Sequence, residues 1–150
     1  MGKLQTFRSR KEELTIGQWI ARKYGLRYVA FDSNSFSDGV LTQPNQTPYR
    51  ICEIKGRNKT YDEHFAKYSD IMIEQYKISQ GLSRADITGV PFTVFVHFGC
   101  GTVVALKVVG VRNDWPIDVL HRTDRRLPND HDSCYQIPKD QWTIIGNWKE

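Results

Sequence analysis

Hydrophobic and polar residues follow a helical spacing near the start of the chain and then alternate in short runs. Over residues 11–24 the apolar positions recur at helical intervals and Gly25 follows, which predicts an amphipathic helix that ends at a glycine. Three short segments rich in aromatic or β-branched residues then predict strands at 27–31, 38–42 and 49–55. The polar segment 43–48 predicts the turn that joins the last two strands into a hairpin.

The second half of the chain predicts one long helix followed by buried strands. Residues 61–80 carry apolar residues on one helical face, and Gly81 is the expected stop. Residues 91–98 form a nearly continuous apolar run, which is typical of a strand buried on both faces, and 102–109 is its expected hairpin partner. Residues 111–150 predict mostly loop, with a short strand around 142–145. The order α-β-β-β-α-β-β predicts a single α/β domain over residues 1–150, with a mixed β-sheet flanked by helices.

The composition of the chain predicts the kind of partner that it binds and the cellular compartment in which it acts. The chain has 150 residues and 39% hydrophobic content, which is enough for one core. The longest apolar runs fall short of the roughly 18 residues that span a bilayer, and the first residues are polar, so we expect neither a membrane span nor a secretory signal. Three cysteines at unrelated spacings predict reduced thiols in the cytoplasm. The net charge of +4 favours a polyanionic partner such as DNA or RNA.

The predicted hairpin brings two carboxylates and an ammonium group together. A turn centred between Asn45 and Gln46 places Asp38 opposite Glu53, with Cβ atoms roughly 5 Å apart. Glu53 and Lys55 share one face of their strand, because residues two apart point to the same side. Adjacent carboxylates repel, and a hard divalent cation such as Mg²⁺ or Mn²⁺ resolves that repulsion. The cluster therefore predicts metal-assisted phosphodiester hydrolysis, in which Lys55 orients the attacking water or offsets developing charge.

Two simpler interpretations of these residues stay open at this point. An Asp followed at some distance by Glu-x-Lys is common, and the Glu53–Lys55 pair could be a surface ion pair worth about 0–1 kcal/mol. The first acid could also be Asp32, whose alternative role is that of a turn residue. The hairpin register favours Asp38.

Several segments in this order carry a resemblance to a known superfamily. Residues 52–57, with the sequence Cys-Glu-Ile-Lys-Gly-Arg, form an apolar strand that ends in Glu-x-Lys, and the helix at 69–77 and the strand at 89–96 follow it. This arrangement resembles the core of the PD-(D/E)xK nucleases, which have the restriction-endonuclease-like fold. Residues 122–126, Asp130 and 135–138 are similar to the tail of small phage-encoded members. The chain departs from the pattern in one respect, since no Pro-Asp precedes the Glu-x-Lys.

The resemblance implies an activity and a set of site residues. It implies an Mg²⁺- or Mn²⁺-dependent DNA endonuclease or exonuclease in which Asp38, Glu53 and the Ile54 carbonyl hold the metal. Many members add a Glu from the first helix, here Glu12 or Glu13, and a Gln or Lys from the later helix, here Gln75 or Lys77. The last two lie about 200° apart around a helix, so only one can face the site squarely. RNA cleavage, a homodimer, and a non-catalytic nucleic-acid-binding or protein-interaction module remain alternatives.

Basic clusters supply candidates for contacts to nucleic-acid phosphates. Arginine suits this role because its planar guanidinium group binds phosphate through two N–H groups. For the arginines at 122–126, pairing with nearby Asp124 and Asp130 is an equally good explanation. Tyr61 and Trp115 could stack on bases or belong to the core. The histidines and cysteines lack the paired spacing of a zinc site. The candidate phosphate contacts are Arg57 and Lys59 in one cluster, and Arg122, Arg125 and Arg126 in the other.

Overall fold

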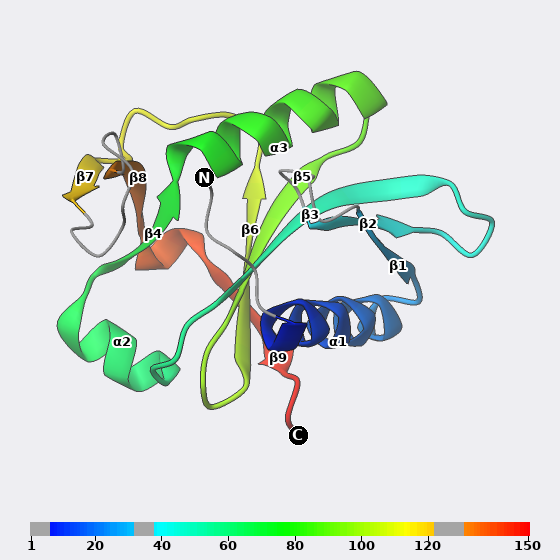
Figure 1. Ribbon diagram of the computed structural model, residues 1–150, viewed down its shortest axis with the longest axis horizontal. Coiled ribbons are helices and arrows are strands. Elements are labelled where there is room, and N and C mark those ends of the chain that lie inside the picture. Colours follow the sequence, from blue (N-terminus) through cyan, green and yellow to red (C-terminus); the bar gives the residue numbers. More distant parts are fainter. Residues whose placement is uncertain (1–6, 32–37, 122–130) are drawn as a thin grey trace.

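The computed structural model describes residues 7–31, 38–121 and 131–150 and has a mixed α/β architecture (Figure 1). Six strands form the main sheet in the order β1-β2-β3-β5-β6-β9, in which β3 and β5 are parallel and the other neighbours are antiparallel. These strands are β1 (Arg27–Ala30), β2 (Gly39–Thr42), β3 (Pro48–Gly56), β5 (Phe92–His97), β6 (Thr102–Val108) and β9 (Thr143–Asn147).

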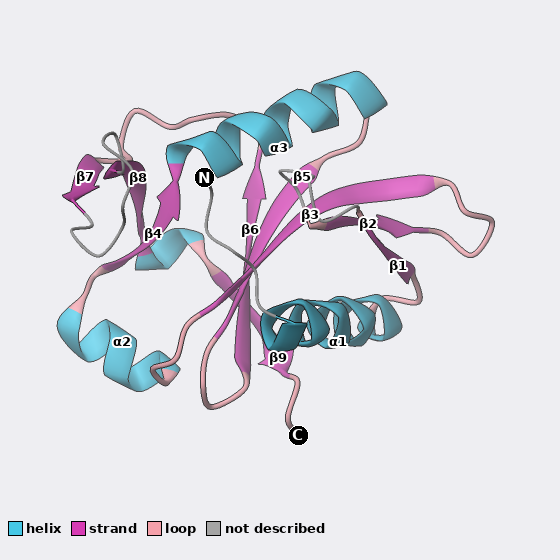
Figure 2. Ribbon diagram, in the orientation of Figure 1, coloured by secondary structure: helices cyan, strands magenta, loops and turns pink. Residues whose placement is uncertain are grey.

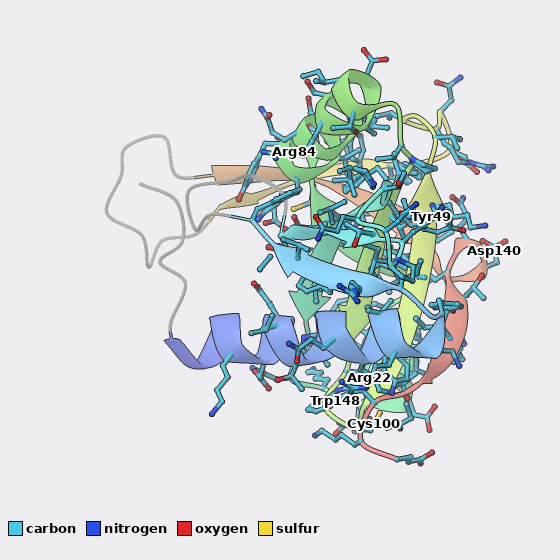
Figure 3. All side chains as sticks on the ribbon, turned by 90° about the vertical axis from the view of Figure 1, so that its right-hand side faces the viewer. Arg22, Tyr49, Arg84, Cys100, Asp140 and Trp148 are labelled. Carbon is cyan, nitrogen blue, oxygen red and sulfur yellow. The ribbon has the colours of Figure 1, made fainter. Side chains whose placement is uncertain are left out.

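Helices lie on both sides of this sheet, as the secondary-structure colouring shows (Figure 2). Helix α1 (Phe7–Lys23) and helix α3 (Gln75–Thr88) pack on opposite sides of it, and a view turned by 90° shows the same separation (Figure 3). Two further helical segments are short: α2 (Tyr61–Lys67) and the 3₁₀ turn η1 (Lys139–Gln141). The predicted α/β class with a mixed sheet and flanking helices is confirmed.

Side chains that alternate along β3 face two different cores. Ile51 belongs to the core on the α3 side, with Phe92 and Val94, whereas Cys52 and Ile54 belong to the core on the α1 side. The strand is therefore buried on both faces, as expected for one that pairs with a parallel neighbour. Because alternate residues point to opposite faces, Glu53 and Lys55 lie on the α3 side.

Residues 61–80 do not form the single predicted helix. Helix α2 ends at Lys67, Tyr68 is extended (φ −122°, ψ 150°), and β4 (Asp70–Glu74) separates α2 from α3. Ile71 and Ile73 are fully buried while their neighbours are half-buried, which is the period of a strand. The apolar residues at 68, 71, 72 and 76 also fit helical spacing, and that coincidence produced the error.

The C-terminal region is richer in strands than its sequence predicts. Strand β8 (His131–Pro138) pairs with β4 on one side and with β7 (Ile117–His121) on the other, forming a second sheet in the order β4-β8-β7. The prediction of mostly loop after residue 110 is therefore wrong. These strands are stabilised by pairing between segments far apart in the sequence, and local patterns do not reveal such pairing.

Gly81 is part of helix α3 instead of its stop, which is Gly89 in the left-handed conformation (φ 74°). A Cβ atom on Gly81 would lie 2.1 Å from the ring of Phe92. The glycine is thus required for the close approach of α3 to β5, and this approach fixes where the first turn of α3 meets the sheet.

Among the described residues, no helix is long and apolar enough to cross a membrane.

Candidate functional site

The β2–β3 hairpin brings Asp38 and Glu53 together in the predicted register. Gly39 pairs with Cys52 and Val40 with Ile51, so Asp38 lies across from Glu53. The Asp38 backbone N–H donates to the Cys52 carbonyl oxygen at 3.0 Å. The Ile54 N–H donates to Asp38 Oδ2 at 2.5 Å, which directs this carboxylate toward β3. The register prediction is confirmed.

Glu53 is a buried carboxyl group with incomplete hydrogen bonding. Its side chain is 2% exposed, and within the described residues Oε1 has no hydrogen-bond partner. Its other oxygen, Oε2, lies 3.3 Å from Lys77 Nζ. Burial and the neighbouring Asp38 raise the pKa of Glu53 to about 8, against the opposing attraction of Lys77 and Lys55. Both causes disfavour the charged form of this carboxyl group.

The other charges in the cluster respond to the same environment. Burial raises the pKa of Asp38, and the Ile54 N–H and the two lysines oppose that shift only in part. Burial also lowers the pKa of Lys77, but the Glu53 and Asp38 carboxylates outweigh it and hold that pKa above its usual value. Lys77 is therefore held as a cation.

Lys55 pairs with a carboxylate that the sequence did not indicate. Its Nζ lies 2.7 Å from Glu74 Oε1 and 2.8 Å from Oε2, so both oxygens hold the ammonium group. Burial disfavours the charge of Glu74, but the Lys55 ammonium outweighs it and holds the pKa of Glu74 below its usual value. Glu74 was missed because residues 70–74 were assigned to a helix; the alternation of Ile71 and Ile73 is the signal that could have placed it at the end of a strand.

Of the two candidates on α3, Lys77 is the one that the structure brings to the site. It contacts Glu53, and Gln75, two positions earlier, points about 200° away around the helix. The alternative left open between the two is thus decided in favour of Lys77, whose ammonium group contacts a buried carboxyl group.

Glu13 of α1 acts electrostatically on the same tyrosine, Tyr28, as the two carboxylates do. Burial first, and then Asp38, Cys52, Glu13 and Glu53, raise the pKa of the Tyr28 phenol. One buried hydroxyl thus lies within electrostatic reach of all three acids. Glu12, the other candidate on this helix, acts instead on His97.

The remaining candidates have more diverse surroundings. Arg57 donates from Nη2 to the Met72 carbonyl oxygen at 2.7 Å and from Nη1 to the Gly56 carbonyl oxygen at 3.1 Å, so its guanidinium joins β3 to β4. Lys59 is exposed. Trp115 is a buried core residue that donates to Gln141, which contradicts a stacking role, and Tyr61 packs edge-on against Phe65 and Phe98. Asp32, Arg122, Arg125 and Arg126 lie outside the described residues.

The donor set of this cluster fits one hard divalent cation. Asp38 and Glu53 supply carboxylate oxygens, and Glu53 Oε1 is a buried acceptor in need of a partner. The Ile54 N–H donates to Asp38. In a strand the N–H and the carbonyl of one residue point to the same side, so the Ile54 carbonyl also points toward the β2 side of β3. Strand β2 begins at Gly39, opposite Cys52, so Ile54 lies beyond the part of β3 that pairs with it. No group of three His, Cys, Asp or Glu side chains gathers within the described part of the chain. Two carboxylates and one carbonyl would leave positions of an octahedral Mg²⁺ for water and substrate.

A solved structure has a fold similar to that of this chain. The Holliday junction resolvase Hjc of the archaeal hyperthermophile Archaeoglobus fulgidus superposes with a TM-score of 0.50 over 86% of this chain and 88% of that protein, at 15% sequence identity. No family model matches the sequence, and neither does any curated protein. The similarity shows that the chain has the restriction-endonuclease-like fold of that resolvase. The resemblance of residues 122–138 to phage-encoded members stays a prediction.

Proposed function

We propose that this protein is a divalent-metal-dependent nuclease that hydrolyses phosphodiester bonds in DNA. The observation that carries the proposal is the burial of Glu53 beside Asp38 with one oxygen lacking a hydrogen-bond donor among the described residues. Two adjacent carboxyl groups in such a place disfavour their own charge, and a cation between them removes the conflict. The restriction-endonuclease-like fold supports the same reading.

The residues of the cluster divide into those that hold the metal and those that act on the substrate. Asp38, Glu53 and the Ile54 carbonyl would hold Mg²⁺ or Mn²⁺, with Glu13 as a candidate outer contact. When bound, the metal lowers the pKa of water and stabilises charge on the phosphoryl group and leaving oxygen. Lys55, held by Glu74, is in place to donate an N–H to the attacking water or to a phosphate oxygen.

Lys77 would contribute a second positive charge beside Glu53. Its Nζ lies 3.3 Å from Glu53 Oε2. With a cation held by Glu53, Lys77 would be available to attract a substrate phosphate. The cluster thus keeps a cation near the carboxylates both before and after metal binding.

Branched DNA is the first substrate to test. The structural neighbour is described as a Holliday junction resolvase, and the +4 net charge of this chain suits a polyanion. Cutting two strands of a junction symmetrically requires two active sites, so a homodimer belongs to this proposal. RNA is the alternative substrate and belongs in the same panel.

The decisive experiment measures metal binding and cleavage together. Mn²⁺ and Mg²⁺ are titrated by calorimetry into wild type, Glu53→Gln, Asp38→Asn and the matched control Asp86→Asn, which alters an exposed carboxylate on α3. Four-way junction, nicked, linear, single-stranded DNA and RNA are then offered to each protein. We expect Glu53→Gln and Asp38→Asn to lose metal binding and to cleave on the order of 100-fold or more slowly, while Asp86→Asn behaves as wild type.

Two outcomes would contradict the proposal. Equal cleavage by wild type and Glu53→Gln would remove this cluster from the chemistry. Absence of metal binding and of cleavage in every protein would favour a non-catalytic nucleic-acid-binding or protein-interaction module on the same fold.

A further inference from the structure

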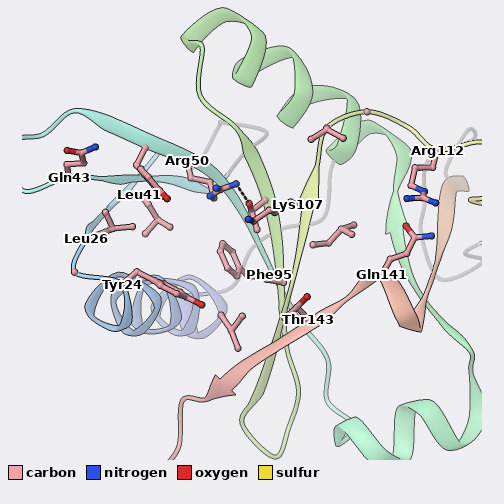
Figure 4. A pocket seen from close by; sticks show the side chains of 18 of the residues that line it. Tyr24, Leu26, Leu41, Gln43, Arg50, Phe95, Lys107, Arg112, Gln141 and Thr143 are labelled. Atoms are coloured by element: carbon pink, nitrogen blue, oxygen red, sulfur yellow. Dashed lines mark hydrogen bonds between the residues drawn. The ribbon is translucent and has the colours of Figure 1, made fainter.

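A groove of about 1060 Å³ opens on the α1 side of the main sheet, on the face opposite to the carboxylate cluster. Tyr24, which directly follows α1, Gln43 of the β2–β3 hairpin and Lys107 of β6 line it (Figure 4). Arg50 lies three residues before Glu53 on β3 and therefore projects from the opposite face. The groove and the proposed metal site are thus separated by the sheet itself.

Two positive side chains line this groove from the strands on either side of β5. Arg50 Nη1 donates to Thr93 Oγ1 at 2.8 Å, and Thr93 pairs with Lys107 in the β5–β6 register, so Arg50 and Lys107 flank the same threonine (Figure 4). Their strands, β3 and β6, are separated by β5 and so lie roughly 10 Å apart. Like charges on the two sides of one threonine repel, and an anion between them relieves that repulsion.

No compensating carboxylate accompanies these two cations. Within the described residues, no acidic oxygen lies within ion-pair distance of Arg50 or Lys107. The acids near the groove are at its other end, where Asp114 is engaged by Arg112 at 2.9 Å and Asp140 is part of the lining. One end of the groove is therefore positive and lacks a protein counter-ion.

Arg50 is already held in a fixed orientation. Its guanidinium bonds Thr93, which is buried, and lies 5.4 Å from the ring centroid of Tyr49. A guanidinium that is fixed in this way loses little freedom when it binds an anion, and its remaining N–H groups match the oxygens of a phosphate.

The rest of the groove is apolar and partly aromatic. Leu41 and Phe95 form its floor, and the rings of Tyr24 and Tyr49 are about half exposed at its rim. Such a surface suits the flat face of a nucleobase, since base–aromatic stacking requires no particular base. A volume of about 1060 Å³ is ample for one nucleotide.

We propose that this groove is a nucleotide-binding site, with the phosphate between Arg50 and Lys107 and the base on the apolar floor beside Tyr24 and Tyr49. The nucleotide is either free in solution or one unit of a nucleic-acid strand that passes over this face. The site requires neither the carboxylates nor a metal, so it stands independently of the proposed nuclease activity.

The test uses the full chain in EDTA, where cleavage does not interfere. Binding of dAMP, inorganic phosphate and a twelve-residue oligo(dT) is measured by calorimetry for wild type, Arg50→Gln, Lys107→Gln and the charge-matched control Lys67→Gln, which alters an exposed lysine on α2. We expect saturable binding of dAMP or of the oligonucleotide, weakened at least about tenfold by Arg50→Gln and by Lys107→Gln. Lys67→Gln should bind as wild type does.

The ligands distinguish the two sources of the nucleotide. Equal affinity per site for dAMP and oligo(dT) would identify a free nucleotide, and a strong preference for oligo(dT) would identify a strand. Binding of inorganic phosphate as tightly as dAMP would overturn the role of the apolar floor. The proposal would be overturned if none of the ligands bound saturably. It would also be overturned if Arg50→Gln and Lys107→Gln, with the same thermal unfolding as wild type, bound the ligands as tightly as wild type does. Lys107 is exposed, so Lys107→Gln keeps the test valid if Arg50→Gln fails to fold.

Discussion

Replacing Glu53 by Gln should stabilise the metal-free protein while removing its proposed metal site. Burial and Asp38 raise the pKa of Glu53 from 4.5 to about 8. At pH 7 Glu53 is therefore mostly protonated in the folded state, whereas in the unfolded chain it is ionised. That difference of about 2.5 pH units corresponds to about 3 kcal/mol of stability lost by wild type. Gln cannot ionise, so the variant avoids this loss.

The sign of the pH dependence follows from the raised pKa. Between pH 4.5 and 8 the folded state binds more protons at Glu53 than the unfolded state does, so wild-type stability falls as pH rises through this window. Loss of the residual attraction of Lys77 offsets part of the gain in the variant. We expect Glu53→Gln to exceed wild type by about 2 kcal/mol at pH 7, or about 5 °C in Tm, and to equal it near pH 4.5.

Urea unfolding in EDTA at four pH values from 5 to 8 measures this difference directly. Comparing the variant with wild type cancels groups that both share, including His97, whose pKa burial lowers. Saturating Mn²⁺ should then stabilise wild type by about 3 kcal/mol at a hundred times its Kd and leave the variant unchanged. A variant less stable than wild type at pH 7 would refute the reasoning, as would a stability difference that does not change with pH.

Three further predictions concern helix α3, strand β4 and the ion pair between Lys55 and Glu74. Gly81→Ala should destabilise the protein by about 1–3 kcal/mol in urea, because its Cβ would meet the Phe92 ring at 2.1 Å; unchanged stability would show that α3 lies further from β5. Ile73→Ala should cost about 2–5 kcal/mol as a fully buried residue of β4, and a loss under 0.5 kcal/mol would contradict its burial. Glu74→Gln should lower kcat of cleavage about tenfold to a hundredfold with metal affinity kept, by releasing Lys55; restoration by Glu74→Asp would separate positioning from folding, and an unchanged kcat would exclude a role of this ion pair.

The hairpin is the part of the site that the sequence predicted best, because its geometry is local. A turn between two short strands fixes the register, and the register alone places Asp38 across from Glu53. The apolar run at 91–98 and its expected hairpin partner at 102–109 also match β5 and β6 to within one residue at each end. Each of these inferences depends only on residues close in the chain.

Strand β4 could not be recognised by the same means. Its residues satisfy helical spacing as well as strand alternation, and the pairing that decides between them comes from β8, more than 60 residues later in the chain. The error then moved the start of α3, so that Glu74 was overlooked and the choice between Gln75 and Lys77 stayed open. One misassigned element thus hid the carboxylate that pairs with Lys55.

The positions of Glu74 and Lys77 explain why Glu53 and Lys55 of the Glu-x-Lys motif do not form an ion pair with each other. Glu53 and Lys55 leave β3 on the same face, yet each is paired with a residue of the β4–α3 segment: Glu53 with Lys77 and Lys55 with Glu74. Both pairs cross from the main sheet to the end of the second sheet, so their geometry exists only after β4 has paired with β8 and α3 has docked. A motif of three residues can therefore be intact while its site is not. This arrangement links the proposed chemistry to the docking of β4 and α3, and it leaves the hairpin carboxylates ready for a cation only in the folded molecule.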